Sequence, residues 1–244
     1  MAARVALAAV VFLTSCVGAD PSGHDEPSDF DPVDWSPDNG KGDFSGVPAT
    51  FDRNNIMDDV VFTTPAVSGD EMQRFLEDSP YGTRSWLADA RLGNLRFADA
   101  VVEIAAASDI DPVVLLARAQ VESSLVSATK QPSKSRTDIA LGCGCADAQS
   151  CASAYLGLAN QLRCAGMVLA GKQAESRAGT GDWRKNRAKR TSDPLIVTPK
   201  NDATAALYAY TPWVLQGRGG NWLVWNVTRK FLKHFDDAGT LHLP

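Results

Sequence analysis

The sequence from Asp111 to Leu125 reads Asp-Pro-Val-Val-Leu-Leu-Ala-Arg-Ala-Gln-Val-Glu-Ser-Ser-Leu, and it predicts a buried helix. Asp111 can cap the start of this helix. Pro112 suits the first helical position, because the N–H that proline lacks would have no helical partner there. Apolar residues then recur at the three-to-four spacing of a buried helical face, at Val114, Ala117, Val121 and Leu125.

Near the end of this apolar helix lies one carboxylate, that of Glu122. Burial disfavours the charged form of a carboxylate, so Glu122 could serve as a general acid. The alternative interpretation is structural: Glu122 is solvated, or it pairs with Arg118 one turn earlier. The spacing alone favours the structural interpretation.

The rest of the chain also shows mainly helical patterns, and alternating strand patterns are scarce. Plausible capping residues precede several of these patterns, at Ser68, Thr83, Asp111, Ser153 and Asn201. Helices are predicted over Gly69–Glu77, Thr83–Leu92, Arg96–Ala107, Pro112–Val126, Ala154–Lys172, Asn201–Tyr210 and Asn221–Phe235. The one short strand candidate is Leu195–Thr198. The predicted fold class is therefore mainly α.

The N-terminus has the pattern of an export signal. Arg4 precedes an apolar run from Val5 to Leu13, which is too short to span a bilayer. The run ends in Leu-Thr-Ser-Cys16, which resembles the bacterial lipobox. In lipoproteins of that kind the signal is cut before the cysteine, and acyl chains on the cysteine anchor the protein to a membrane. The alternative is an ordinary secreted protein cut nearby.

An acidic, proline-rich segment follows the signal. Residues 1–43 hold two basic and eight acidic residues, which leaves the remainder nearly neutral although the whole chain has a net charge of -5. Such a composition predicts disorder. The expected organisation is a signal peptide over residues 1–15, a tether over 16–50, and one helical domain over 51–244 in the cell envelope.

Four cysteines remain after Cys16, at Cys143, Cys145, Cys151 and Cys164. In an exported domain they predict two structural disulfides. Cys143 and Cys145 are too close in sequence to pair comfortably, so we expect each to join one of the other two. A zinc site is disfavoured because the usual ligand spacing is absent.

Histidine is nearly absent from the domain, with only His234 and His242 near the C-terminus. The domain therefore has too few histidines for a mechanism that needs a catalytic histidine or a histidine-rich metal site. We predict no metal and no cofactor. Carboxylates and aromatic residues remain, which suits glycoside cleavage. The densest aromatic and amide stretch contains Tyr208, Tyr210, Trp213 and Asn221, which are candidate sugar contacts or, alternatively, packing residues.

A basic run extends from Arg184 to Arg190. Such runs can bind nucleic acid, but an exported protein rarely meets it. We expect a solvated loop first, contact with anionic wall groups second, and no nucleic-acid partner.

The segment Ile110–Leu125 resembles the catalytic-helix motif of the lysozyme-like lytic transglycosylases and related glucosaminidases, in which a hydrophobic helix ends in Glu-Ser and the Glu is the general acid. Glu122 and Ser123 match that motif. Ala140–Gly142 stands about where the family has a Gly-Leu-Met-Gln-like substrate loop, although Cys-Gly-Cys follows here in place of Met-Gln. Ala206–Pro212 is similar to the later Ala-Tyr-Asn-Ala-Gly-Pro motif, with Tyr208 and Tyr210 both candidates for its tyrosine.

The resemblance implies a lysozyme-like helical fold and cleavage of peptidoglycan between N-acetylmuramic acid and N-acetylglucosamine. Transglycosylases of this family use one carboxylate and leave an anhydro end. A hydrolase would need a water-holding group as well, for which Asp138 is a candidate. The alternatives are a wall-binding lipoprotein without activity on the same fold, and an enzyme for another N-acetylglucosamine polymer such as chitin. The sequence does not indicate an oligomeric state.

Overall fold

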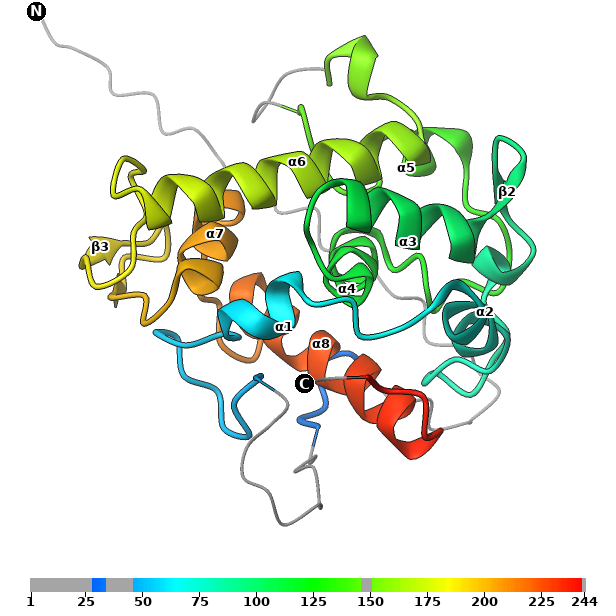
Figure 1. The fold of residues 1–244 in the computed structure, drawn as a ribbon, viewed down its shortest axis with the longest axis horizontal. Coiled ribbons are helices and arrows are strands. Elements are labelled where there is room, and N and C mark those ends of the chain that lie inside the picture. The colour runs from blue at the N-terminus through cyan, green and yellow to red at the C-terminus, as the bar shows by residue number, and fades with distance from the viewer. Residues whose placement is uncertain (1–27, 34–45, 146–150, 243–244) are drawn as a thin grey trace, which may run out of the picture.

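The computed structural model describes residues 28–33, 46–145 and 151–242 (Figure 1). These residues form a mainly α-helical fold with two short antiparallel hairpins, as the sequence predicts. The helices are α1 (Asp59–Thr63), α2 (Gly69–Glu77), α3 (Phe97–Ala107), α4 (Pro112–Ser123), α5 (Lys134–Asp138), α6 (Leu158–Arg177), α7 (Asp202–Tyr210) and α8 (Gly220–Asp237). The strands are β1 (Arg91–Leu92), β2 (Leu95–Arg96), β3 (Lys189–Arg190) and β4 (Ile196–Val197), and two 3-10 turns are η1 (Trp86–Ala88) and η2 (Ser153–Tyr155).

Helix α4 is the central element of the core. Every residue from Pro112 to Gln120 is buried, so the helix is covered on all sides. It packs against α8, α3 and α6. In Figure 1 it lies between α6, which crosses the top of the view, and α8 below. The predicted buried helix is therefore confirmed, with Val114, Ala117 and Leu125 fully buried and Val121 half-buried; neighbouring helices also cover its other sides.

Several predicted helix starts are confirmed with their caps. Asp111 accepts a hydrogen bond from Val113 N, and Asn201 accepts one from Thr204 N. Ser68 forms a reciprocal capping box with Glu71 at the start of α2. These local bonds satisfy N–H groups that have no partner inside the helix, which explains why the sequence reveals the start of a helix well.

The predicted helix over Thr83–Leu92 is wrong. The chain there forms only η1, capped by Ser85 rather than Thr83, followed by the β1–β2 hairpin. Backbone bonds to distant segments compete with a helix: Ser85 N donates to Leu76 O, and Trp86 N donates to Ala128 O. Tertiary contacts thus override the helical pattern.

Two other predicted boundaries also shift. Helix α4 ends at Ser123 rather than Val126, because Ser124 adopts a left-handed conformation with φ of 49°. Helix α6 begins at Leu158 rather than Ala154, because Gly157 has φ of 96° and separates it from η2. The predicted strand is confirmed as Ile196–Val197, paired with β3.

The predicted disorder of the tether is wrong for residues 28–33, which pack against the helical domain. The domain also begins earlier than residue 51, because Val47 is fully buried in the core. The predicted signal peptide and the lipidation candidate Cys16 lie outside the described residues. Within the described ranges, no helix has the length and apolar character needed to cross a membrane.

Candidate active site

The C-terminal end of α4 presents Glu122 at the edge of the core. Its side chain is 32 % exposed, whereas Arg118, one turn earlier, is completely buried. The Nη2 group of Arg118 donates to Glu122 Oε1 and, at 2.7 Å, to the hydroxyl of Thr211. The ion pair that the sequence allowed is therefore present, and Thr211 shares its guanidinium.

The guanidinium of Arg118 lies over the ring of Tyr210, with Cζ 4.5 Å from the ring centroid. Its Nε and Nη1 have no hydrogen-bond partner among the described residues. A buried cation with unpaired donors costs free energy, which the ring and the Glu122 carboxylate offset in part. Arg118 is thus a fixed positive charge beside Glu122.

Ser123 connects the end of α4 to the loop that begins at Ala140. Its hydroxyl donates to Ala140 O at 2.7 Å, 17 residues later in the chain. The loop itself is held by Gln161 of α6, whose Oε1 accepts from Leu141 N and Cys143 N at 3.1 Å each. Gln161 is fully buried, so these hydrogen bonds are shielded from water.

Tyr210 closes the same arrangement from the side of α7. Its hydroxyl donates to Leu141 O at 2.8 Å. Burial raises the pKa of Tyr210 to about 12, and the Glu122 charge acts in the same direction against that of Arg118. The hydroxyl therefore stays protonated and remains a hydrogen-bond donor across the physiological range.

Two disulfides hold the loop that follows Gly142. Cys143 pairs with Cys164 of α6, and Cys145 pairs with Cys151. This confirms the prediction that Cys143 and Cys145 each join one of the other two cysteines. The first disulfide fixes the loop to α6 directly beside the Gln161 contacts, so covalent and polar links act on the same segment.

The structure separates the two candidate tyrosines. Tyr208 is fully buried and stacks on Trp183 with ring centroids 5.1 Å apart. Burial raises the pKa of its hydroxyl, which has no hydrogen-bond partner among the described residues. Tyr208 offers no surface to a sugar, and its role as a substrate contact is corrected to one in the core.

Asn221 and Trp213 act together at the start of α8. Asn221 is fully buried, and its Nδ2 donates to Thr211 O at 2.7 Å and to Trp213 O at 3.2 Å. Gly220 permits this close approach, since a Cβ there would lie 2.7 Å from Trp213 O. Asn221 therefore shapes the segment that carries Thr211 and does not face solvent, whereas Trp213 is half-buried.

Asp138 has a partner of its own. Its carboxylate accepts from Lys134 Nζ at 2.5 Å within α5. No hydrogen bond or ion pair joins Asp138 to Glu122 in the part of the chain that the structure describes. The structure thus brings Glu122, Ser123 and Tyr210 together and leaves Asp138 outside their network.

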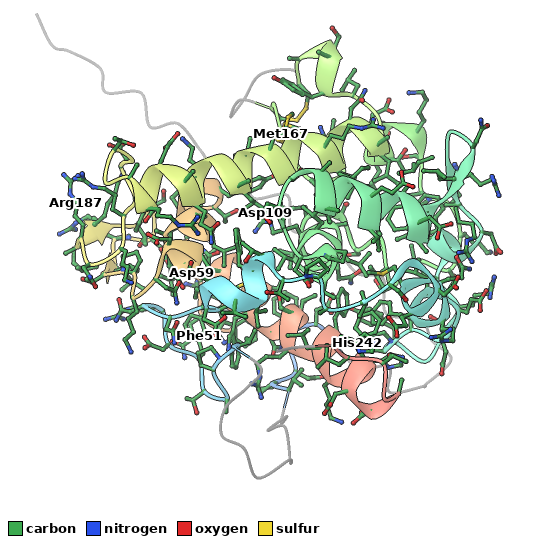
Figure 2. All side chains as sticks on the ribbon, in the orientation of Figure 1. Phe51, Asp59, Asp109, Met167, Arg187 and His242 are labelled. Atoms are coloured by element: carbon green, nitrogen blue, oxygen red, sulfur yellow. A yellow bond between two sulfur atoms is a disulfide. The ribbon has the colours of Figure 1, made fainter. Side chains whose placement is uncertain are left out.

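The basic run from Arg184 to Arg190 lies at the end of the molecule that carries β3, where Figure 2 labels Arg187. Lys189 pairs with Asp182, and Arg187 is exposed. Among the described residues, no group of three or more metal-ligating side chains is present.

Sequence reasoning missed Thr211 and Gln161 as parts of this site. Thr211 lies inside the tyrosine-rich segment, but nothing in the pattern shows that it accepts from Arg118. Gln161 looks like an ordinary polar position of a long helix. A fully buried glutamine between helix and loop is recognisable only in three dimensions.

Comparisons with protein-family models, with curated proteins and with solved structures found no match to this chain. The site is therefore defined by its own geometry. It offers one partly exposed carboxylate, Glu122, beside the buried guanidinium of Arg118 at the end of α4. The loop bonded to this helix end is held to α6 by a disulfide. Such a carboxylate can donate or accept a proton at a bound ligand, and the cation can counter negative charge.

Proposed function

We propose that this protein cleaves the glycan strands of peptidoglycan on a lysozyme-like fold, with Glu122 as the single general acid/base at MurNAc–GlcNAc bonds. One observation carries the proposal. The three segments that resemble the transglycosylase motifs are far apart in sequence, yet hydrogen bonds join the end of α4 to the Ala140–Gly142 loop and join that loop to Tyr210. One moderately specific motif and two weak ones that meet at the end of one helix support an active site better than any one alone.

In the proposed reaction, protonated Glu122 gives its proton to the glycosidic oxygen as the bond to the anomeric carbon breaks. The resulting carboxylate then takes a proton from the group that attacks the anomeric carbon. In a transglycosylase this group is a hydroxyl of the same sugar, which yields an anhydro end. In a hydrolase it is water.

The guanidinium of Arg118 opposes this acid step, because a nearby cation stabilises the charged form of a carboxylate. Thr211 offers the guanidinium a second acceptor at 2.7 Å, so Arg118 keeps a partner when Glu122 turns toward a ligand. A bound glycan would also cover the 32 % of the Glu122 side chain that is exposed. Loss of water favours the neutral acid.

A second candidate function is a wall-binding lipoprotein without activity, anchored through Cys16. The Arg118–Glu122 ion pair favours it, because a carboxylate held by Arg118 could accept hydrogen bonds from sugar hydroxyls without donating a proton. In both proposals the protein is exported, lipid-anchored in a bacterial envelope and bound to glycan strands.

Incubation of purified sacculi with the full mature chain separates the two proposals. We expect the wild type to release soluble muropeptides and Glu122→Gln to lower the rate about 10²- to 10⁴-fold. Glu103→Gln, which changes an exposed carboxylate of α3, is the matched control and should behave as wild type. Sacculus binding without release by the wild type would favour the second function. A preference for chitin over sacculi would change the substrate but retain the role of Glu122.

A further inference from the structure

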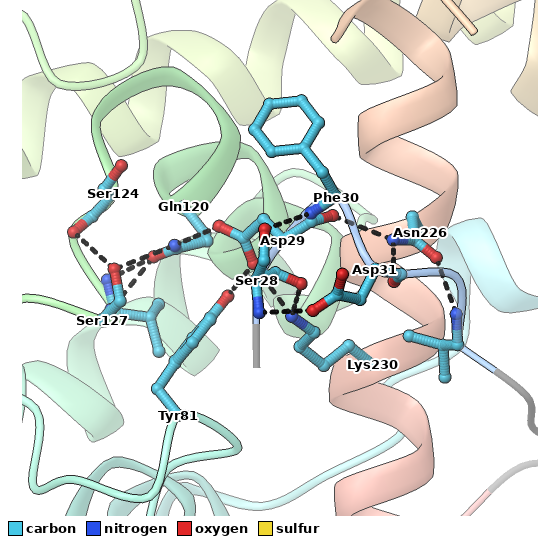
Figure 3. A network of polar contacts seen from close by, with 12 residues as sticks. Ser28, Asp29, Phe30, Asp31, Tyr81, Gln120, Ser124, Ser127, Asn226 and Lys230 are labelled. Carbon is cyan, nitrogen blue, oxygen red and sulfur yellow. Dashed lines mark hydrogen bonds and ion pairs between the residues drawn. The ribbon is translucent and has the colours of Figure 1, made fainter. Parts of the chain in front are cut away.

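A short N-terminal segment, Ser28–Val33, lies across α4 and α8, and we call it the strap (Figure 3). The side chain of Asn226 in α8 makes three hydrogen bonds to the backbone of the strap. The Nδ2 group donates to Asp29 O at 2.9 Å and to Asp31 O at 2.7 Å, while Oδ1 accepts from Val33 N at 3.1 Å. Asn226 is fully buried, and both N–H donors and the oxygen of its amide bind the strap.

The carboxylate of Asp29 is the polar centre of the strap. Its Oδ2 accepts from Gln120 Nε2 at 2.6 Å, and its Oδ1 accepts from the hydroxyl of Tyr81. Lys230 Nζ lies 3.3 Å from Oδ1 and donates to Ser28 O at 2.8 Å. The Lys230 side chain is 8 % exposed and that of Asp29 17 % exposed, so this is a largely buried ion pair.

The negative charge of Asp29 acts on both Lys230 and Tyr81. Burial lowers the pKa of Lys230, and the charges of Asp29 and Asp31 oppose that effect. Burial raises the pKa of Tyr81, and the neighbouring Asp29 raises it further. A buried pair of this kind is costly when either partner is removed. The strap is therefore a built part of the fold.

Gln120 passes this contact on to the end of α4. Its Oε1 accepts from Val126 N at 2.9 Å and from Ser127 N at 3.1 Å, and its Nε2 also donates to Ser127 Oγ at 3.0 Å. Gln120 is almost completely buried. It thus ties the strap to the turn that terminates α4, where Ser124 has its left-handed conformation.

We propose that Asp29 is a positioning residue for Glu122. The strap fixes Gln120, Gln120 fixes the turn after α4, and that turn sets the direction of the last helical residues. This inference rests on the proposed function, because it assigns the strap a role in that same site. A misplacement of about 1 Å at a reacting group can cost about 10²-fold in rate.

The test uses the full mature chain with Asp29→Asn, and Asp31→Asn as the matched control. Asp31 carries the same charge on the same segment and acts on Lys230 through that charge, but among the described residues its carboxylate accepts a hydrogen bond only from Ser28 N. We expect Asp29→Asn to lower turnover on soluble glycan strands about tenfold to hundredfold with little change in KM. It should also speed hydrogen exchange at Val126 and Ser127 about tenfold. Asp29→Glu, which keeps the charge, should restore part of both.

Gln120→Met provides a second variant, because it removes the middle link and leaves the bonds of the strap to Asn226 and Lys230 in place. The same faster exchange and lower turnover are expected. Unchanged exchange at Val126 and Ser127 in both variants would overturn the proposal. Higher turnover in Asp29→Asn would also overturn it, because the strap would then obstruct the site. If the wild type releases no glycan, the proposed function fails, and the exchange result still decides whether the strap holds the helix end.

Discussion

The two ends of α4 carry one carboxylate each, and they differ in almost every physical respect. Asp111 at the start is completely buried, and its two oxygens accept from Val113 N and Ala66 N at 2.6 Å each. Glu122 at the end is partly exposed and is bound by Arg118, whose Nε and Nη1 have no partner in the described part of the chain. Backbone N–H groups bind both oxygens of the first carboxylate, whereas the second is partly open to solvent.

This difference indicates that the start of α4 contributes stability, whereas its end carries the candidate catalytic group. The buried hydrogen bonds of Asp111 contribute stability, and they leave its oxygens inaccessible to a ligand. Glu122 has an exposed face next to a fixed charge and is available for chemistry, and a glutamine there would keep an acceptor for the buried Arg118. Substitutions at the two ends should therefore separate stability from activity.

Asp111→Ala should produce the largest loss of stability. It removes the helix cap and leaves the buried N–H groups of Val113 and Ala66 without acceptors, which together cost about 3 kcal/mol in the free energy of unfolding. Urea unfolding measures this value. The folded fraction should keep its rate of glycan release. Glu103→Ala, an exposed position of α3, should change stability by less than about 0.5 kcal/mol. A similar loss in both variants would remove the contrast.

The pH dependence of stability should follow Asp111. Burial raises the pKa of Asp111 to about 7, against the backbone N–H groups that favour its carboxylate. The unfolded chain releases this proton near pH 4, so the folded state holds one more proton between pH 4 and 7. Its stabilising contribution is present at the acidic end and is lost as the pH rises toward 7, by at most about 1.4 kcal/mol per pH unit.

Unfolding in urea at several pH values between 4.5 and 7 measures this effect. Asp111→Asn keeps an acceptor for Val113 N but cannot titrate, so its stability should vary less over the same range. The window excludes Glu71, whose pKa is lowered to about 2: burial raises it, but the Ser68 backbone and hydroxyl and His242 outweigh that effect. An equal slope in Asp111→Asn and the wild type would assign the pH dependence to another group.

The smallest effect should distinguish the two tyrosines of α7. Tyr210→Phe loses the bond to Leu141 O, which costs about 1 kcal/mol, and should slow glycan release because the loop beside Glu122 loosens. Tyr208→Phe removes a hydroxyl that has no partner among the described residues and keeps the stack on Trp183. It should leave stability and release within about 0.5 kcal/mol of the wild type. Equal effects in both would contradict the placement of Tyr210 at the site.

Local signals explain what could be predicted of the fold. The caps at Ser68, Asp111 and Asn201 act within three residues, so the starts of α2, α4 and α7 follow from sequence. The short separation of Cys143 and Cys145 predicted that each joins one of the other two cysteines, and only the structure shows that Cys143 pairs with Cys164 and Cys145 with Cys151. Export and lipidation remain predictions, because Cys16 lies outside the described residues.

Long-range contacts explain what could not be predicted. The Thr83–Leu92 pattern is helical, yet backbone bonds to Leu76 and Ala128 hold the chain in another shape. The strap has an acidic, proline-rich composition that usually indicates disorder. Its order depends on Gln120, Asn226 and Lys230, which lie about 90 to 200 residues later in the chain.

In the candidate site, as in the fold, local features were predictable from the sequence and long-range contacts were not. Glu122 and Ser123 lie together on one helix, so their motif is local and both reach the site. Tyr208 and Tyr210 are two residues apart, and only packing shows that the first faces Trp183 while the second faces Arg118. Asn221 was a candidate sugar contact, but its amide supports the segment around Thr211 instead.

The central claim is that Glu122 transfers a proton to and from the glycan. Mass spectrometry of the soluble products from purified sacculi tests it most directly, with the wild type and Glu122→Gln compared at equal folded concentration. We expect muropeptides with new anhydro or reducing sugar ends from the wild type and a loss of about 10²-fold or more in Glu122→Gln. The same products at the same rate from Glu122→Gln would contradict it.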